Sequence, residues 1–171
     1  MSNVERDWYQ WKWAILALHS SLQGFMVMAL RGSDGLNCLR DDVAAEWFRA
    51  YRAGEKLPIE KLDNFLNLYK KIKKANKMTF YIHSKPFKPS GTEGTSIKKI
   101  NSLRNDFVHF VPKSWSLEVT GLPPIFLDCL NIIDFLGWRC NNIIWYESAV
   151  EKRASKALSE AMKRIKDLKD S

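Results

Sequence analysis

An arginine, an asparagine and a histidine lie close together in this chain, among the apolar residues Leu103, Phe107, Val108 and Phe110. The segment that contains them is INSLRNDFVHFVPKSW, residues 100–115, and the three residues are Arg104, Asn105 and His109. An arginine can hold a phosphate through two parallel hydrogen bonds. A histidine changes its protonation near neutral pH, and an amide can orient either group. These three side chains therefore suit cleavage of a phosphodiester, in which the histidine handles the protons.

The same spacing also fits an ordinary amphipathic helix. At about 100° per residue, Asn105 and His109 lie about 40° apart on a helix and point away from its apolar side. Arg104 lies at the flank, and its long side chain reaches across. His109 falls in the predicted last turn, where the helix dipole favours an imidazolium. From spacing alone, a polar trio on the solvent-facing side of a helix is the simpler interpretation.

The order of the three residues resembles a known family motif. Arg104-Asn105-x-x-x-His109 is similar to the R-x4-6-H motif of HEPN domains, including a polar residue directly after the arginine. The resemblance implies an all-α, HEPN-like helical bundle that forms a homodimer, with the motifs of two subunits meeting in one cleft. Many HEPN domains are metal-independent ribonucleases of toxin–antitoxin, abortive-infection and CRISPR-linked defence systems. Others bind nucleotides or partners without catalytic activity.

The resemblance also implies a role for each residue. Arg104 would stabilise the phosphate, His109 would act as general base or acid, and Asn105 would assist their orientation. The expected reaction is attack of an RNA 2′-hydroxyl on the adjacent phosphate, without a metal or a cofactor. The competing hypothesis is a non-catalytic HEPN-like module that binds nucleotide, RNA or a protein partner such as an antitoxin. A third is a structural interaction protein whose polar trio faces solvent.

The charge of the chain favours an anionic partner. Lys and Arg number 27 against 19 Asp and Glu, a formal net charge of +8. Such a balance attracts nucleic acid through long-range electrostatics and counterion release. Lysines at a helix end also simply complement the helix dipole, so both interpretations stay open. The residues expected to contact RNA are Lys70, Lys71, Lys73, Lys74, Lys77, Lys98, Lys99 and, by stacking on a base, Trp115.

Cysteine usage and the N-terminal sequence bear on the compartment. Three scattered cysteines without a CxxC pair favour a reducing environment. The first residues, MSNVERDWYQWKW, include acidic side chains and do not resemble a signal peptide. The apolar stretch 13–30 is interrupted by polar residues and is more typical of a core helix than of a membrane span. We therefore expect a cytoplasmic protein with RNA as partner and no membrane.

The remaining two histidines have simpler interpretations. His19 lies on the first predicted helix, where a core or interface histidine with a hydrogen-bond partner is expected. His83 lies in a loop, and nothing in the sequence requires it to reach a site.

Apolar periodicity predicts five to six helices in one domain over residues 1–171. The first carries an apolar face from Trp11 to Ala29. The second begins at Asp41 or Asp42 and ends at Gly54. The third covers 57–77, with Pro58 in its first turn. A long loop, 78–95, precedes the motif helix, and 78–82 within it is a candidate for a short extended piece.

The second half of the chain continues this pattern. Ser96 is expected to cap the motif helix, which should end at Pro112. The segment WSLEV, 115–119, alternates like a brief strand. A fifth helix is expected from Pro123–Pro124, with its apolar stripe continuing to Ile144. The last helix covers residues 147–170, and the faces away from its apolar stripe are charged.

Overall fold

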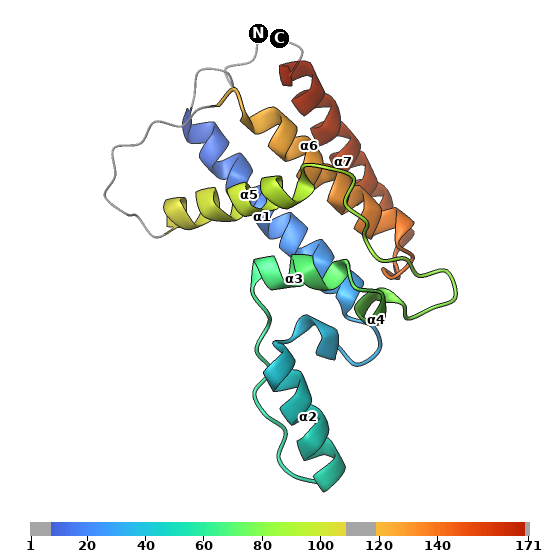
Figure 1. The fold of residues 1–171 in the computed structure, drawn as a ribbon. Coiled ribbons are helices and arrows are strands. Elements are labelled where there is room, and N and C mark those ends of the chain that lie inside the picture. Colours follow the sequence, from blue (N-terminus) through green and yellow to red (C-terminus); the bar gives the residue numbers. More distant parts are fainter. Residues whose placement is uncertain (1–7, 109–118, 170–171) are drawn as a thin grey trace. The chain divides into compact units, whose positions relative to one another are not determined.

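The computed structural model describes residues 8–108 and 119–169, and over these residues the chain is all-α (Figure 1). The only strand-like pairing within them is an isolated antiparallel bridge between Leu39 and Leu62. The all-α prediction is therefore confirmed. The α-helices are α1 (Trp8–Leu30), α2 (Asp41–Ala53), α3 (Phe65–Ile72), α4 (Ala75–Met78), α5 (Glu93–Val108), α6 (Leu122–Asp134) and α7 (Ser148–Lys169). Two short pieces join them: a 3-10 turn, η2 (Leu36–Cys38), and a π-helical turn, η3 (Phe135–Arg139).

The chain divides into two compact units. Unit 1 is built from residues 1–22, 89–135 and 144–171, and unit 2 from residues 23–88 and 136–143. The segments of the two units alternate along the chain, and α1 contributes residues to both. The prediction of one domain over 1–171 stays a prediction beside this division.

Unit 1 contains α5, α6 and α7 together with the first part of α1. Helix α6 packs against both α5 and α7. Trp11 of α1 meets Phe126 of α6 edge to face, with ring centroids 5.3 Å apart. The apolar periodicity of the four segments explains this packing, because each buries one stripe. Fully buried side chains of this core are Ile15, Leu22, Ile97, Ile100, Leu122 and Ile132.

Helix α1 is apolar for most of its length. By length and composition, Gln10–Leu30 is long and apolar enough to cross a membrane, the one such helix among the described residues. A core helix passes the same test, and α1 buries Ile15 and Leu22 in unit 1 and Met26 and Leu30 in unit 2. These apolar side chains of α1 are therefore part of the buried core of the two units.

Unit 2 is held together by hydrogen bonds between segments that are distant in sequence. Asn142 is buried, and its amide donates to the carbonyl oxygens of Ala29 at 3.0 Å and Met78 at 2.8 Å. The amide of Lys85 donates to the Cys140 carbonyl, and that of Phe87 to the Ile72 carbonyl. The expected long loop before the motif helix is thus tied to unit 2 over its first half.

The third predicted helix is shorter than expected. Residues 55–64 are not helical, so Pro58 does not lie in a first turn, and α3 begins after Asn64. The Asn64 side chain accepts a hydrogen bond from the amide of Asn67 at 2.9 Å, which is an N-cap. Instead, the Lys61 carbonyl accepts a hydrogen bond from the Arg40 amide, and the Asp63 amide donates to the Cys38 carbonyl. Because of this pairing, residues 61–63 are not part of the helix. After α3 ends, the chain forms a second short helix, α4.

The predicted extended piece at 78–82 is absent from the structure. Met78 is the last residue of α4, and Tyr81 and Ile82 form a turn. The predicted strand 115–119 and the predicted helix end at Pro112 fall almost entirely outside the described residues.

The motif helix starts at Glu93, one turn earlier than expected. The Glu93 carboxylate is buried and accepts hydrogen bonds from the amide and hydroxyl of Ser90 and from the amide of Gly91. These bonds hold the turn that precedes the helix, and the carboxylate charge complements the positive end of the helix dipole. Ser96 does not cap the helix, because it lies within the first turns of α5. Its hydroxyl donates a hydrogen bond to the Asp128 carboxylate of α6 at 2.6 Å.

Glu93→Gln is expected to lower the free energy of unfolding by about 1–2 kcal/mol at neutral pH. Burial alone would raise the pKa of Glu93, but the hydrogen bonds of Ser90 and Gly91 lower it from 4.5 to about 2. Because the pKa is lower in the folded state, this stabilisation is complete above pH 4.5 and fades as the pH falls towards 2. Urea unfolding at pH 7 and pH 2.5 measures it, since the two proteins should differ less at the lower pH. An equal difference at both values would contradict the assignment.

The fifth helix ends before the predicted apolar stripe does. Helix α6 ends at Asp134 and continues as η3 to Arg139, so Ile144 lies outside it. A Cβ on Gly137 would come within 3.0 Å of a ring carbon of Phe25, so the glycine permits close packing at this turn. Asn141 adopts a left-handed conformation with φ 60°, which stops the helix before the buried Asn142.

Candidate functional site

Arg104 and Asn105 lie next to each other on α5 in unit 1. Both side chains are half-buried, while Leu103 and Phe107 beside them face the core. The Arg104 guanidinium donates from Nη1 to Oδ1 of Asn105 at 3.1 Å. This bond fixes the amide with its oxygen towards the arginine, so its nitrogen, a donor, points away.

A histidine of α1 lies close to this part of α5. His19 of α1 is buried at 4% exposure, and its Nε2 lies 3.4 Å from Oδ1 of Asn101, one turn before Asn105 on α5. Burial lowers the pKa of the His19 imidazole, the contact with Asn101 opposes this change, and the positive charge of Arg104 lowers it further. The lowered pKa favours the neutral imidazole, so Arg104 is the charged side chain of this group.

The arrangement suits recognition of an anion. The guanidinium and the amide N–H belong to adjacent residues, and both are hydrogen-bond donors of the kind that contact phosphate oxygens. Partial burial of both side chains strengthens their electrostatic effect, because the surroundings are less polar than water. Asn101, Arg104 and Asn105 share one side of α5, as their spacing of three and four residues requires.

Two predicted site residues cannot be placed. His109 and Trp115 lie outside the described residues, so the structure does not test the spacing between His109 and Arg104. The expected pairing of two motif copies across a dimer axis also stays a prediction.

The predicted RNA-binding lysines belong to both units. Lys98 and Lys99 are exposed on α5, the helix that carries Arg104. Lys70, Lys73 and Lys74 are exposed in unit 2, around the end of α3. Lys73 lies over the ring of Tyr69, with Nζ 4.6 Å from the ring centroid. Lys77 is mostly covered, and its Nζ lies 3.5 Å from a carboxylate oxygen of Asp41.

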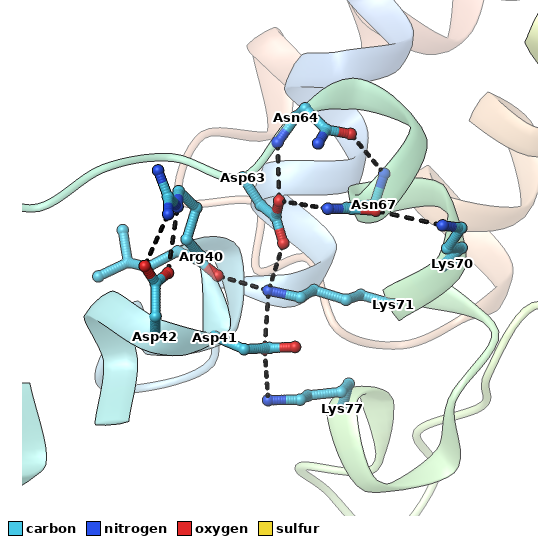
Figure 2. Close-up of polar contacts among 10 residues, drawn as sticks. Arg40, Asp41, Asp42, Asp63, Asn64, Asn67, Lys70, Lys71 and Lys77 are labelled. Carbon is cyan, nitrogen blue, oxygen red and sulfur yellow. Dashed lines mark hydrogen bonds and ion pairs between the residues drawn. The ribbon is translucent and has the colours of Figure 1, made fainter. Parts of the chain in front are cut away.

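Lys71 requires a correction. Figure 2 shows its ammonium between Asp63 and Asp41, with Nζ 2.8 Å from the first carboxylate and 3.0 Å from the second. It also donates to the carbonyl of Leu39, and its side chain is only 3% exposed. The Asp63 carboxylate is 5% exposed and accepts further bonds from the amide of Asn64 and the side chain of Asn67. Lys71 is therefore a structural ion-pair residue of unit 2 and is not available to RNA phosphates.

The chain was compared with protein-family models, curated proteins and solved structures. No protein-family model, no curated protein and no solved structure matches this chain.

Two residues of the group around Arg104, Asn101 and His19, were not predicted as site residues. Asn101 could have been found from its position one turn before Asn105 on the same helical face. His19 could not, because its contact with Asn101 joins residues 82 positions apart.

Proposed function

We propose that this protein is a cytoplasmic, metal-independent endoribonuclease of HEPN type, with Arg104, Asn105 and His109 as its catalytic residues. The observation that carries the proposal is the half-buried Arg104 guanidinium fixed against Asn105 on α5. The family motif supplies His109 as the proton-transfer group. A role as a toxin or defence effector, held in check by an antitoxin, accords with this chemistry.

The reaction is a transfer of the phosphoryl group within the RNA. His109 takes the proton of a ribose 2′-hydroxyl as its oxygen forms a bond to the adjacent phosphorus. Arg104 and the Asn105 amide stabilise the additional negative charge on the phosphoryl oxygens. The bond from phosphorus to the 5′-oxygen then breaks, and that oxygen receives a proton. The products are a 2′,3′-cyclic phosphate and a free 5′-hydroxyl.

A homodimer would complete this site. One copy of the motif offers a single histidine, whereas the reaction needs a base at the 2′-oxygen and an acid at the 5′-oxygen. Two copies that meet across a two-fold axis would supply both groups from identical chains.

The test is cleavage of a labelled RNA in EDTA, beside His109→Ala as a control for contaminating nuclease. Cleavage is expected from the native protein alone, and a single 2′-deoxy nucleotide at the mapped position should block it there. Cleavage by the His109→Ala variant, cleavage that requires added metal, or cleavage of the 2′-deoxy position would contradict the mechanism. RNA binding without cleavage would instead favour the non-catalytic binding module.

A further inference from the structure

The outer face of α7 carries a row of lysines and serines. We define the lysine stripe as the six residues Ser148, Lys152, Lys156, Ser159, Lys163 and Lys166, all of which are exposed. At about 100° and 1.5 Å per residue, they fall within an arc of about 80° and extend over about 27 Å of the helix. No other residue of α7 projects into that arc.

The charge on this face is of one sign. The three carboxylates of α7 belong to Glu151, Glu160 and Asp167, and by the same helical projection all three lie outside the arc. One of them touches the stripe: an oxygen of Glu160 lies 4.0 Å from Nζ of Lys156, whose side chain is 79% exposed. An exposed pair at that distance contributes little. The stripe therefore presents four ammonium groups in a row, with the Ser159 hydroxyl between them and the Ser148 hydroxyl at one end.

We infer that the lysine stripe is a binding surface for the phosphate backbone of RNA. A nucleic-acid strand carries a regular row of negative charges, and ammonium and hydroxyl donors are groups that contact phosphate oxygens. Such contacts carry no sequence information, so the stripe holds the strand while other residues select the site of reaction. The inference depends on the proposed function for the identity of the polyanion as RNA.

A protein or a membrane fits this face less well. Protein interfaces depend on buried aromatic or aliphatic anchors, and the stripe has none. A helix that lies on a membrane inserts its apolar face. In α7 that face is opposite the stripe and is engaged within unit 1, where α7 packs against α6 and buries Leu158.

The test compares two triple variants of α7 with equal loss of charge. The first, Lys156→Gln, Lys163→Gln and Lys166→Gln, removes cations from the stripe. The control, Arg153→Gln, Arg164→Gln and Lys169→Gln, removes exposed cations from other faces of the same helix. Both are made in the full chain carrying Arg104→Ala, which slows the cleavage of bound RNA during the measurement. Thermal unfolding verifies that each variant is folded. Fluorescence anisotropy with a labelled single-stranded RNA in EDTA gives Kd over a range of salt concentrations.

The stripe variant is expected to bind RNA roughly tenfold to a hundredfold more weakly at 0.1 M salt. The plot of log K against log salt concentration should have a slope about 2 units shallower for this variant. Each lost phosphate contact to a single strand contributes about 0.7 to the slope, and three lysines are removed. The control variant should change Kd and the slope with salt much less. Equal losses in the two variants, no RNA binding by the parent protein, or stripe-dependent binding only to vesicles of anionic phospholipid would overturn the inference.

The stripe variant made in the native background, with Arg104 intact, separates this inference from the proposed function. If it cleaves RNA at an unchanged kcat but a raised KM, both proposals are supported. Cleavage with unchanged KM would contradict the stripe alone. Stripe-dependent binding by a native protein that cleaves nothing would contradict the ribonuclease alone.

Discussion

Lys71→Met is expected to lower the free energy of unfolding by about 3–5 kcal/mol, because it leaves the Asp63 carboxylate buried without its cation. Methionine fills a similar volume, so the loss reflects charge and hydrogen bonds and not a cavity. The measurement is urea unfolding at pH 7, followed by circular dichroism. A loss of this size is a large part of the stability of an ordinary domain, so the variant should also melt at a clearly lower temperature.

The reason for the size of this effect lies in the neighbours of the ammonium group. Lys71 joins three segments of unit 2, since it contacts Asp63 before α3, Asp41 at the start of α2, and the Leu39 carbonyl. Burial alone would raise the pKa of Asp63, but the bonds from Lys71, Asn67 and Asn64 lower it below its usual value. The contribution of Asp63 is therefore present above the usual carboxyl pKa and is lost as the pH falls through the lowered one.

Two further variants show whether the buried charge is the cause. Lys70→Met alters the exposed neighbour on the same helix and should change stability by no more than about 0.5 kcal/mol. The double variant Lys71→Met, Asp63→Leu removes both charges and should recover much of the loss, because an apolar pair of similar volume needs no counter-charge. If Lys71→Met is as stable as the native protein, or the double variant is the least stable, this account is wrong.

The lysine run at the end of α3 shows what the sequence could and could not predict. Five lysines of similar spacing suggested one exposed basic surface, but Lys71 falls only about 60° from Leu68 on the helix and so borders its apolar stripe. That position was a signal for burial. Its partners were not predictable, because Asp41 belongs to another helix and the predicted helix 57–77 placed Asp63 about two turns away from Lys71.

Helix boundaries were predictable where local signals were complete. Helix α2 has acidic residues in its first turn and a left-handed Gly54 directly after it, as its sequence predicted. The third predicted helix failed because residues 61–63 form backbone hydrogen bonds with the segment around Leu39. The predicted end of the fifth helix was wrong because the buried Asn142 side chain donates hydrogen bonds to the carbonyls of Ala29 and Met78 in unit 2. Periodicity measures where apolar residues repeat, and it contains no information on such non-local bonds.

The surroundings of Arg104 were predicted in part. The sequence indicated that Arg104 and Asn105 lie beside an apolar helical face, and α5 places them there, half-buried. It assigned His19 to the core with a hydrogen-bond partner, which the structure confirms as Asn101. What it could not indicate is the electrostatic influence of Arg104 on that histidine, since this depends on how α1 packs against α5.

Arg104→Ala is expected to lower the rate of RNA cleavage at saturating substrate by about 10²–10³-fold, the usual cost of removing one donor to transition-state charge. Arg104→Lys should restore only part of this rate, because an ammonium is a point charge and cannot form the forked pair of bonds. The measurement is single-turnover cleavage of a labelled RNA in EDTA, with the folding of each variant verified by thermal unfolding.

The matched control is Arg153→Ala, which removes an exposed arginine of unit 1 from α7, outside the lysine stripe. Its cleavage rate should stay within about twofold of the native value, because Arg153 is an exposed charge on a different helix and is screened by solvent and salt. If Arg104→Ala retains nearly the full rate, or Arg153→Ala loses as much, Arg104 does not act on the phosphate. An equal rate for Arg104→Lys and the native protein would show that charge alone suffices, and that the fixed guanidinium beside Asn105 is not required.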